Sequence, residues 1–242
     1  MTIDVDAFNA KAIPGLEALT KLMLSGASDH APAPEALRPF QVGWGFLAAL
    51  HRQAAAVVVL HHNGLAHEAA PNRRLMVEYV AKLQWLVRDG DAAVESMNKA
   101  HQYAHSKLRE AADAGEYQYD AEAADAVRDA VIPSGTTDQF NNMKNLLERL
   151  GGGLFQSWVS ETQLSHATLT AAGCFYKDTL DKLELLAEPT YGIEGDPMEM
   201  SPYIAFFFMY FGMAAFNELM NGSPWTDELD RIGAANGLAS SE

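Results

Sequence analysis

Tyr203-Ile-Ala-Phe-Phe-Phe-Met-Tyr-Phe-Gly-Met-Ala-Ala-Phe216 is the most apolar stretch of the chain and the one that decides the fold. At 14 residues it is too short to cross a bilayer, which takes about 20 residues. A run that is apolar on every side predicts a helix buried among other helices. Aromatic and Met side chains also suit a subunit interface. The stretch therefore predicts the middle of a helical bundle or, alternatively, the contact surface of a homo-oligomer.

Helical patterns occupy most of the remaining sequence, whereas the alternating Val, Ile, Thr and Tyr runs of strands are almost absent. We predict an all-α fold: one domain over residues 1–242, built as a single bundle of about seven to nine helices. The N-terminal helix, broken or restarted at Pro14, is expected to be peripheral. The predicted helical segments, before a disordered tail at 236–242, are 5–24, 35–62, 71–89, 92–112, 120–131, 139–150, 154–176, 203–216 and a short one from 223.

Finer features accompany these segments. Residues 92–112 are expected to pack against the bundle through one apolar stripe that includes Val94 and Leu108. Thr137 or Asp138 could cap the helix predicted over 139–150. Gly151-Gly152-Gly153 is interpreted as a turn between helices, because no strand precedes it and no Lys-Ser/Thr follows it as in a P-loop.

The acidic composition constrains the partners of this protein. Its 242 residues include 17 Lys and Arg against 32 Asp and Glu, a net charge of −15. A polyanion repels phosphate backbones unless its basic residues converge locally, so general nucleic-acid binding is disfavoured. The seven acids from Glu110 to Asp129 are interpreted as a solvated face.

Three features bear on localisation. The single cysteine, Cys174, excludes an intrachain disulfide, and residues 1–6 lack the basic and apolar regions of a secretory signal. His51-Arg52-Gln53 interrupt the other long apolar segment, residues 42–60, which argues against a membrane span. The sequence predicts a cytoplasmic protein without a membrane partner.

Histidine spacing raises the question of a metal site. His101 and His105 lie one helical turn apart, the spacing at which two imidazoles can bind one metal. Gln102 follows His101, so the zincin pattern is absent. No Asp or Glu lies three residues before any His, as a carboxylate-bridged di-iron site requires. We expect a polar helix surface with no metal and no cofactor, while a metal completed by distant ligands stays open.

Two segments carry the candidate site residues. In the first, Arg74 and Glu78 lie one turn apart at the edge of an apolar stripe, and Trp85 follows. Basic-before-acidic is the poorer order for stabilising a helix, so surface stabilisation is a weak explanation. In the second, Ser165 and His166 lie in a stretch that otherwise packs. These five residues form the candidate ligand-binding set, and Arg74, Glu78 and His166 are also the catalytic candidates.

Together these segments resemble an uncharacterised all-helical family that is usually grouped with HEPN-like bundles. Its members have Arg-x-x-x-Glu on an early helix, an apolar or Trp-containing turn, and Ser-His or Ser-x-x-His on a later helix, and the five candidate residues match this pattern over about residues 60–216. The resemblance implies a HEPN-like core in which Arg, Glu and His converge between two helices. It also implies a defence-related role, because that grouping includes ribonucleases of toxin–antitoxin and phage-defence systems besides nucleotide-binding and structural members.

The ribonuclease pattern of that grouping is missing. It requires an Arg, four to six intervening residues and a His on one helix, and no Arg here has a His at that distance: Arg52 and His61 are too far apart. Ribonuclease activity is therefore not implied by motif.

Three hypotheses of different classes remain open. The first is a binding or interaction module in which Arg74, Glu78 and His166 hold the helices in register or receive a small molecule. The second is a metal-independent hydrolase or nuclease with His166 as general acid and base and Arg74 stabilising anionic charge. The third is a structural homodimer that uses the helix Tyr203–Phe216 as its interface.

Overall fold

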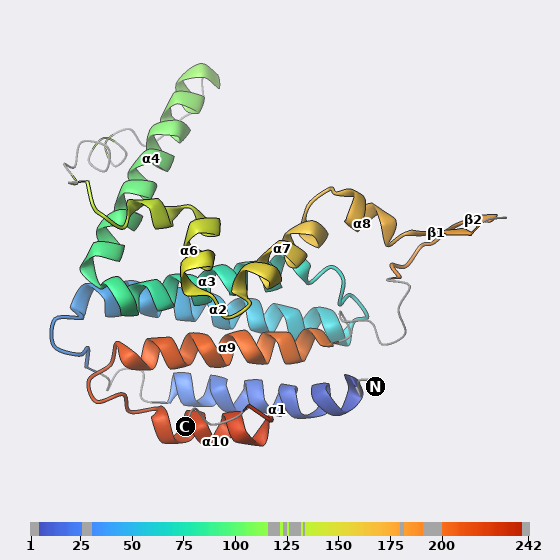
Figure 1. Ribbon diagram of the computed structural model, residues 1–242, viewed down its shortest axis with the longest axis horizontal. Coiled ribbons are helices and arrows are strands. Elements are labelled where there is room, and N and C mark those ends of the chain that lie inside the picture. Colours follow the sequence, from blue (N-terminus) through green and yellow to red (C-terminus); the bar gives the residue numbers. More distant parts are fainter. Residues whose placement is uncertain are drawn as a thin grey trace.

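A computed structural model describes residues 5–25, 31–115, 134–179, 182–190 and 200–238, together with residues 122, 125 and 132. These residues form helices with one small two-stranded sheet (Figure 1), so the predicted all-α bundle is confirmed, whereas its HEPN-like core stays an expectation. The elements are α1 Val5–Leu24, α2 Leu37–His62, α3 Ala70–Asp89, α4 Asp91–Gly115, the 3-10 helix η1 Asp138–Asn141, α6 Met143–Leu150, α7 Leu154–Ser165, α8 Leu169–Gly173, β1 Tyr176–Thr179, β2 Lys182–Leu185, α9 Ser201–Glu218 and α10 Thr226–Ala235.

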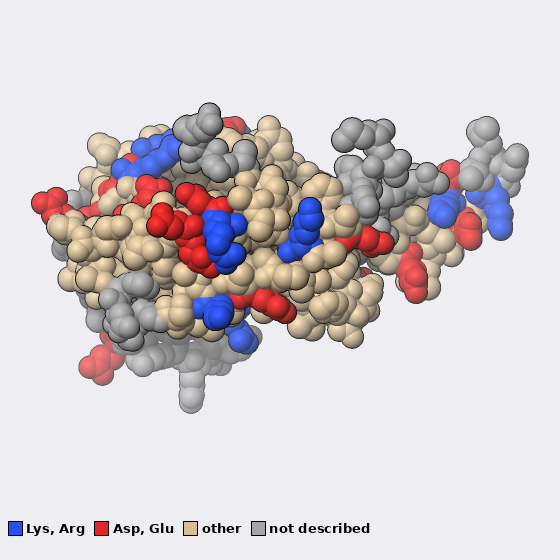
Figure 2. Space-filling model, turned by 90° about the horizontal axis from the view of Figure 1, so that it is seen from below, with Lys and Arg blue, Asp and Glu red and all other residues tan. Residues whose placement is uncertain are grey.

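Four long helices, α1, α9, α2 and α3, form the main layer (Figure 1). Helix α9 packs against each of the other three. Helix α10 packs on α1 and α9 at one side, and α6 and α7 cover α3 at the other. Seen from the side of α1 and α10, the surface carries acidic and basic side chains next to each other (Figure 2). Within α10, Arg231 forms an ion pair with Glu228.

Helix α9 is the central helix that the sequence predicts. Phe206, Met209 and Met213 have no exposed surface. Gly212 permits a close approach to α2, because a Cβ there would lie 2.2 Å from Cδ2 of Leu50. Phe207 and Tyr210, which were also expected in the core or an interface, are partly buried and pack at the margin of the core, as do Ile204, Phe211 and Ala214.

Among the described residues, α2 is the one helix that is long and apolar enough to pass a length-and-composition test for a membrane span. This is weak evidence, because core helices of soluble proteins pass the same test. Leu47, Leu50 and Val57 of α2 are completely buried within the bundle, where α2 packs against α3 and α9.

Helix α1 corrects the expectation of a break at Pro14. The helix runs through Pro14 without interruption. Proline removes one backbone hydrogen bond, but Ala12 and Leu19 are completely buried where α1 packs on α9 and α10. Tertiary packing of one apolar face supplies most of the stability of a helix in a protein, and here it outweighs the lost bond.

The predicted helix over 139–150 is divided in two. A single 3-10 turn, η1, comes first, and α6 begins after Asn142, whose side chain accepts a hydrogen bond from the N–H of Asn145 at 3.3 Å. Thr137 and Asp138 do not cap this helix. They bind α4 instead, since both contact the hydroxyl of Ser96 at 2.7 Å.

The predicted helix over 154–176 ends early. Helix α7 stops at Ser165, and Thr168 caps the short α8 by accepting a hydrogen bond from the N–H of Ala171 at 3.1 Å. Beyond α8 the chain forms the antiparallel pair β1 and β2, with Tyr176 opposite Leu185. The sequence pattern did not reveal this hairpin, which extends away from the bundle (Figure 1).

Most of the buried residues of helix α4 lie near its beginning, although Ala112 near its end is buried too. Val94 is buried, but Leu108 is 56% exposed, so the expected apolar stripe along the whole helix is wrong. The outer half of α4 projects from the bundle (Figure 1). The predicted acidic helix 120–131 lies outside the described residues except for residues 122 and 125, which are helical.

The expected disordered tail does not begin at residue 236. Asn236 is buried, and its side-chain amide donates to the carbonyl oxygen of Ile232 at 2.9 Å. Leu238 packs against the core. Residues 236–238 are therefore part of the fold, while residues 239–242 lie outside the described residues.

Candidate ligand site

A buried arginine joins three elements that surround the candidate site. Arg73 on α3 has no exposed surface, and its Nε lies 2.8 Å from Oε1 of Glu161 on α7. Its Nη1 donates to Oγ of Ser201 at the start of α9, at 2.6 Å, and to the carbonyl oxygen of Ala66 at 2.7 Å. Because these bonds are charge-assisted and shielded from water, they fix α3, α7 and α9 relative to one another.

Arg74 and Glu78 form a second, more exposed link between α3 and α7. Their Nη2 and Oε1 atoms lie 2.8 Å apart, and their side chains retain 25% and 22% exposure. Trp158 of α7 donates its indole N–H to Oε1 of Glu78 at 2.9 Å, and the guanidinium of Arg74 lies 5.6 Å from the centre of the Trp158 ring. Arg74 also donates to Oγ1 of Thr162 at 3.1 Å.

The other predicted site residues lie apart from this pair. Trp85 is completely buried and donates to Oδ2 of Asp89 at 2.8 Å. Ser165 donates to the carbonyl oxygen of Glu161 within its own helix. His166 is exposed at the end of α7, not surrounded by apolar side chains as expected. In the described part of the chain, Arg74 and Glu78 meet α7 through Trp158 and Thr162 instead of His166.

Lys82 lies beside this network and has an unusual environment. Its ammonium group lies 4.6 Å from the centre of the Trp85 ring. Burial lowers the pKa of Lys82 from 10.5 to about 8, although the nearby Glu78 acts in the opposite direction. The lysine therefore carries a charge at neutral pH that the fold accommodates at a cost.

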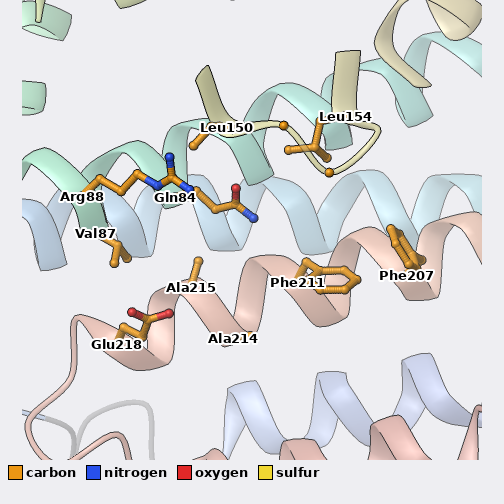
Figure 3. Close-up of a pocket in the computed structure, with 12 residues that line it drawn as sticks. Gln84, Val87, Arg88, Leu150, Leu154, Phe207, Phe211, Ala214, Ala215 and Glu218 are labelled. Atoms are coloured by element: carbon orange, nitrogen blue, oxygen red, sulfur yellow. The ribbon is translucent and has the colours of Figure 1, made fainter. Parts of the chain in front are cut away.

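A pocket of about 520 Å³ opens between α3, α9 and the turn that joins α6 to α7 (Figure 3). Its volume is within the usual range for small-molecule sites. None of the five predicted site residues lines it. The lining residues are Gln84, Val87 and Arg88 of α3, Leu150, Gly151, Gly152 and Leu154 of the turn region, and Phe207, Phe211, Ala214, Ala215 and Glu218 of α9.

The glycine turn forms one wall of this pocket. Gly151, Gly152 and Gly153 have φ angles of 73°, 64° and 79°, a conformation that side chains with a Cβ rarely adopt. A Cβ on any of them would meet nothing within 4 Å, so backbone conformation and not lack of space requires glycine. The turn between helices that the sequence predicts is confirmed, and it sets Leu150 and Leu154 at the rim (Figure 3).

The pocket has an apolar part and a polar end. Phe207 and Phe211 lie at one end of the close-up, and Gln84 and Arg88 extend from α3 at the other, with Glu218 of α9 across from them (Figure 3). Arg88 also donates weakly to the carbonyl oxygen of Arg149, at 3.4 Å. The polar end thus offers a cation, an amide and a carboxylate to a bound molecule.

Arg149 stabilises the helix ends beside this pocket. Its Nη2 donates to Oδ1 of Asp89 at 2.8 Å, and this contact lowers the pKa of the Asp89 carboxyl below its usual value. Its guanidinium lies 4.3 Å from the centre of the Phe140 ring. The end of α3, which carries Arg88, is thereby tied to η1 and to the end of α6.

His101 and His105 face each other on α4, with ring centres 4.3 Å apart. Among the residues that the structure describes, no group of three His, Cys, Asp or Glu side chains is arranged to hold a metal ion.

The residues that line the pocket were not predicted, because no sequence pattern distinguishes them from other residues of their helices. Arg73, by contrast, had a signal: it lies three residues before Met76 and seven before Val80, on the buried face of α3. Arg74 and Glu78 lie at the edge of that face. Periodicity could therefore have indicated which of the two adjacent arginines is buried.

The fold and the pocket define an all-helical bundle protein with a preformed cavity. Residues 41–153 match the model of DUF5677, a family of unknown function. The match confirms the resemblance to an uncharacterised family but not the HEPN-like grouping. It covers α3 and the Leu150–Gly152 wall of the pocket, and the α9 wall lies outside it. Comparison with curated proteins and with solved structures found no match.

Proposed function

We propose that this protein is a binding module for a small amphipathic organic molecule, held in the pocket of Figure 3. The observation that carries the proposal is the division of one cavity of about 520 Å³ into an apolar part and a polar end. Ligand sites are typically apolar clefts in which a few placed polar groups fix orientation.

The lining indicates the chemistry of the ligand. An aromatic or aliphatic body would contact Phe207, Phe211 and Leu154, where removal of apolar surface from water favours binding. A polar head would lie between Arg88 and Gln84 on one side and Glu218 on the other. Arg88 favours an anionic or acceptor group there, and Glu218 favours a donor.

Binding fits this lining better than catalysis. The described residues that line the pocket include no His, Cys, Ser, Thr, Lys or Tyr, and their ionisable groups are Arg88 and Glu218, both exposed. General acid–base and nucleophilic catalysis typically use a positioned group of one of those types or a carboxylate held away from water. The two polar networks of α3 and α7 support the proposal by holding the walls in place.

The proposal is tested with two fluorescent probes that share an aromatic body. The anionic probe is 8-anilinonaphthalene-1-sulfonate, and the neutral one is N-phenyl-1-naphthylamine. We expect both to bind the wild-type protein with increased fluorescence. Arg88→Gln should lower the affinity for the anionic probe about threefold to tenfold, because one exposed charge contact is lost. It should leave the affinity for the neutral probe unchanged.

Two further variants sharpen the test. Glu218→Gln should strengthen binding of the anionic probe, because a repelling carboxylate is removed from the polar end. Arg52→Gln, an exposed arginine on α2 away from the pocket, is the matched control and should change neither affinity. Absence of binding, or equal effects of Arg88→Gln and Arg52→Gln, would contradict the proposal.

A further inference from the structure

We propose that two copies of this chain join through the outer edge of β2 and form a four-stranded antiparallel sheet. The inference is independent of the pocket. It rests on the exposure of the β1–β2 hairpin and on the way the sequence of β2 complements itself.

The hairpin extends from α8, away from the helical bundle (Figure 1). All four residues of β2 are exposed, and Leu183 and Leu185 retain 61% and 80% of their surface. The base of the hairpin is secured to its own stem, because the N–H of Leu186 donates to the carbonyl oxygen of Phe175 at 2.9 Å. The ring of Phe175 in turn lies 5.6 Å from that of His67.

Such a hairpin is only marginally stable by itself in water. In the described part of the chain the sheet has two strands, and a two-stranded hairpin alone is marginal. Its outer edges present backbone N–H and C=O groups that can pair with another strand. A partner strand would add a new row of backbone hydrogen bonds along such an edge.

One face of the hairpin is mainly apolar. Opposite residues share a face, so the register places Tyr176 beside Leu185 and Asp178 beside Leu183. Lys177 and Glu184 are opposite each other on the other face, together with Lys182. The hairpin thus has one mainly apolar and one mainly charged side.

The sequence of β2 is complementary to itself. If two β2 strands pair antiparallel about Leu183, each Leu183 lies opposite the other, and each Lys182 lies opposite the Glu184 of the second copy. Opposite charges in directly opposed positions stabilise a sheet. The same register joins the two apolar faces on one side and extends the row Lys177–Glu184 to Lys182 of the second copy.

Other pairings are less favourable. If the pairing of two β2 strands is centred between Leu183 and Glu184 instead, each leucine lies opposite a charged residue. The apolar faces of the two hairpins then lie on opposite sides of the sheet. Pairing β1 with itself about Lys177 or Asp178 sets like charges opposite each other. Pairing β1 between those two residues again separates the apolar faces. The charge pairs and the leucines therefore favour a second copy bound through β2, in the register centred on Leu183.

The test measures the mass of the full-length protein over a range of concentrations by analytical ultracentrifugation. We expect a dimer that dissociates on dilution. Lys182→Glu should raise the dissociation constant about tenfold or more, because two attractive cross-strand pairs become repulsive. The hairpin lies outside the core, so circular dichroism and melting temperature should be unchanged.

A charge reversal tests the register itself. The triple variant Lys177→Glu, Lys182→Glu and Glu184→Lys keeps opposite charges both within the hairpin and between copies, so it should restore the wild-type dissociation constant. Leu169→Arg is the matched control, because Leu169 is 92% exposed on α8 but is not in the sheet, and it should leave dimerisation unchanged. A wild-type monomer at every concentration would overturn the proposal. So would a dimer that Lys182→Glu does not weaken, or one that the triple variant fails to restore.

Discussion

Arg73 and Arg74 are adjacent in the sequence, but they have different environments. Arg73 is completely buried and paired with Glu161, whereas Arg74 and Glu78 form a partly exposed pair. Breaking a buried pair leaves an uncompensated charge in a medium of low polarity, while an exposed pair is screened by water. A difference of one position along α3 thus decides how much a salt bridge contributes to the stability of the fold.

The first prediction compares the two carboxylates. Glu161→Gln should lower the free energy of unfolding by about 3 to 5 kcal/mol, because the buried charge of Arg73 loses the carboxylate that pairs with it. Glu78→Gln should cost about 0 to 1 kcal/mol, since water can reach Arg74 and the Gln oxygen can still accept from Trp158. Urea denaturation of both variants measures the difference. Equal losses would show that the burial of the Arg73 pair has no energetic consequence.

The second prediction concerns Lys82, whose pKa falls from 10.5 to about 8 on folding because of burial. Between these two pH values the unfolded chain binds more protons than the folded one, so stability rises with pH across that window. Below pH 8 both forms are charged and the fold bears the full cost, roughly 3 kcal/mol.

Lys82→Met tests this directly. The variant should be more stable than wild type at pH 7.5, and the difference should shrink as the pH approaches 10.5, because wild type regains the lost stability. Urea denaturation at pH 7.5 and 10 gives the two values. A wild-type stability that falls relative to Lys82→Met over this range would refute the inferred environment of Lys82.

At the level of elements, periodicity predicted α2, α3 and α9 well because each buries an apolar stripe. It failed where short-range hydrogen bonds end a helix. Thr168 and Asn142 both cap helices within segments that looked continuous, and the pattern of apolar residues carries no information on such caps. The hairpin was missed for a different reason: β2 alternates polar and apolar residues over only the four positions Lys182–Leu185, a run too short to stand out from the helical pattern around it.

The third prediction tests the close contact of α9 with α2. Gly212→Ala should destabilise the protein by about 1 to 3 kcal/mol, because its Cβ would lie 2.2 Å from Leu50 and the core would have to shift. Gly45→Ala is the matched control on α2, where a Cβ meets nothing within 4 Å. That variant should gain up to about 1 kcal/mol from helix propensity. Thermal denaturation shows both, and a stabilising Gly212→Ala would contradict the packing.

At the level of the whole molecule, the sequence predicted the all-α bundle but not the pocket. The walls come from α3, the α6–α7 turn and α9, and more than a hundred residues separate Gln84 from Phe207. No local pattern marks residues that meet only in the folded state. The predicted polar residues and the pocket are nevertheless related, because Arg73, Arg74 and Glu78 hold α3 to α7, and Arg73 also binds α9.

Filling the cavity with a larger side chain tests whether it is the ligand site. Ala214 of α9 lines the pocket and is partly exposed, so Ala214→Phe adds an aromatic ring in the space that a ligand body would occupy. Ala111→Phe, at an exposed position on α4, adds the same ring elsewhere. The measurement is the affinity for N-phenyl-1-naphthylamine by fluorescence titration. We expect Ala214→Phe to lower this affinity about tenfold or more and Ala111→Phe to leave it unchanged. Unchanged binding by Ala214→Phe would show that the pocket between α3 and α9 is not the ligand site.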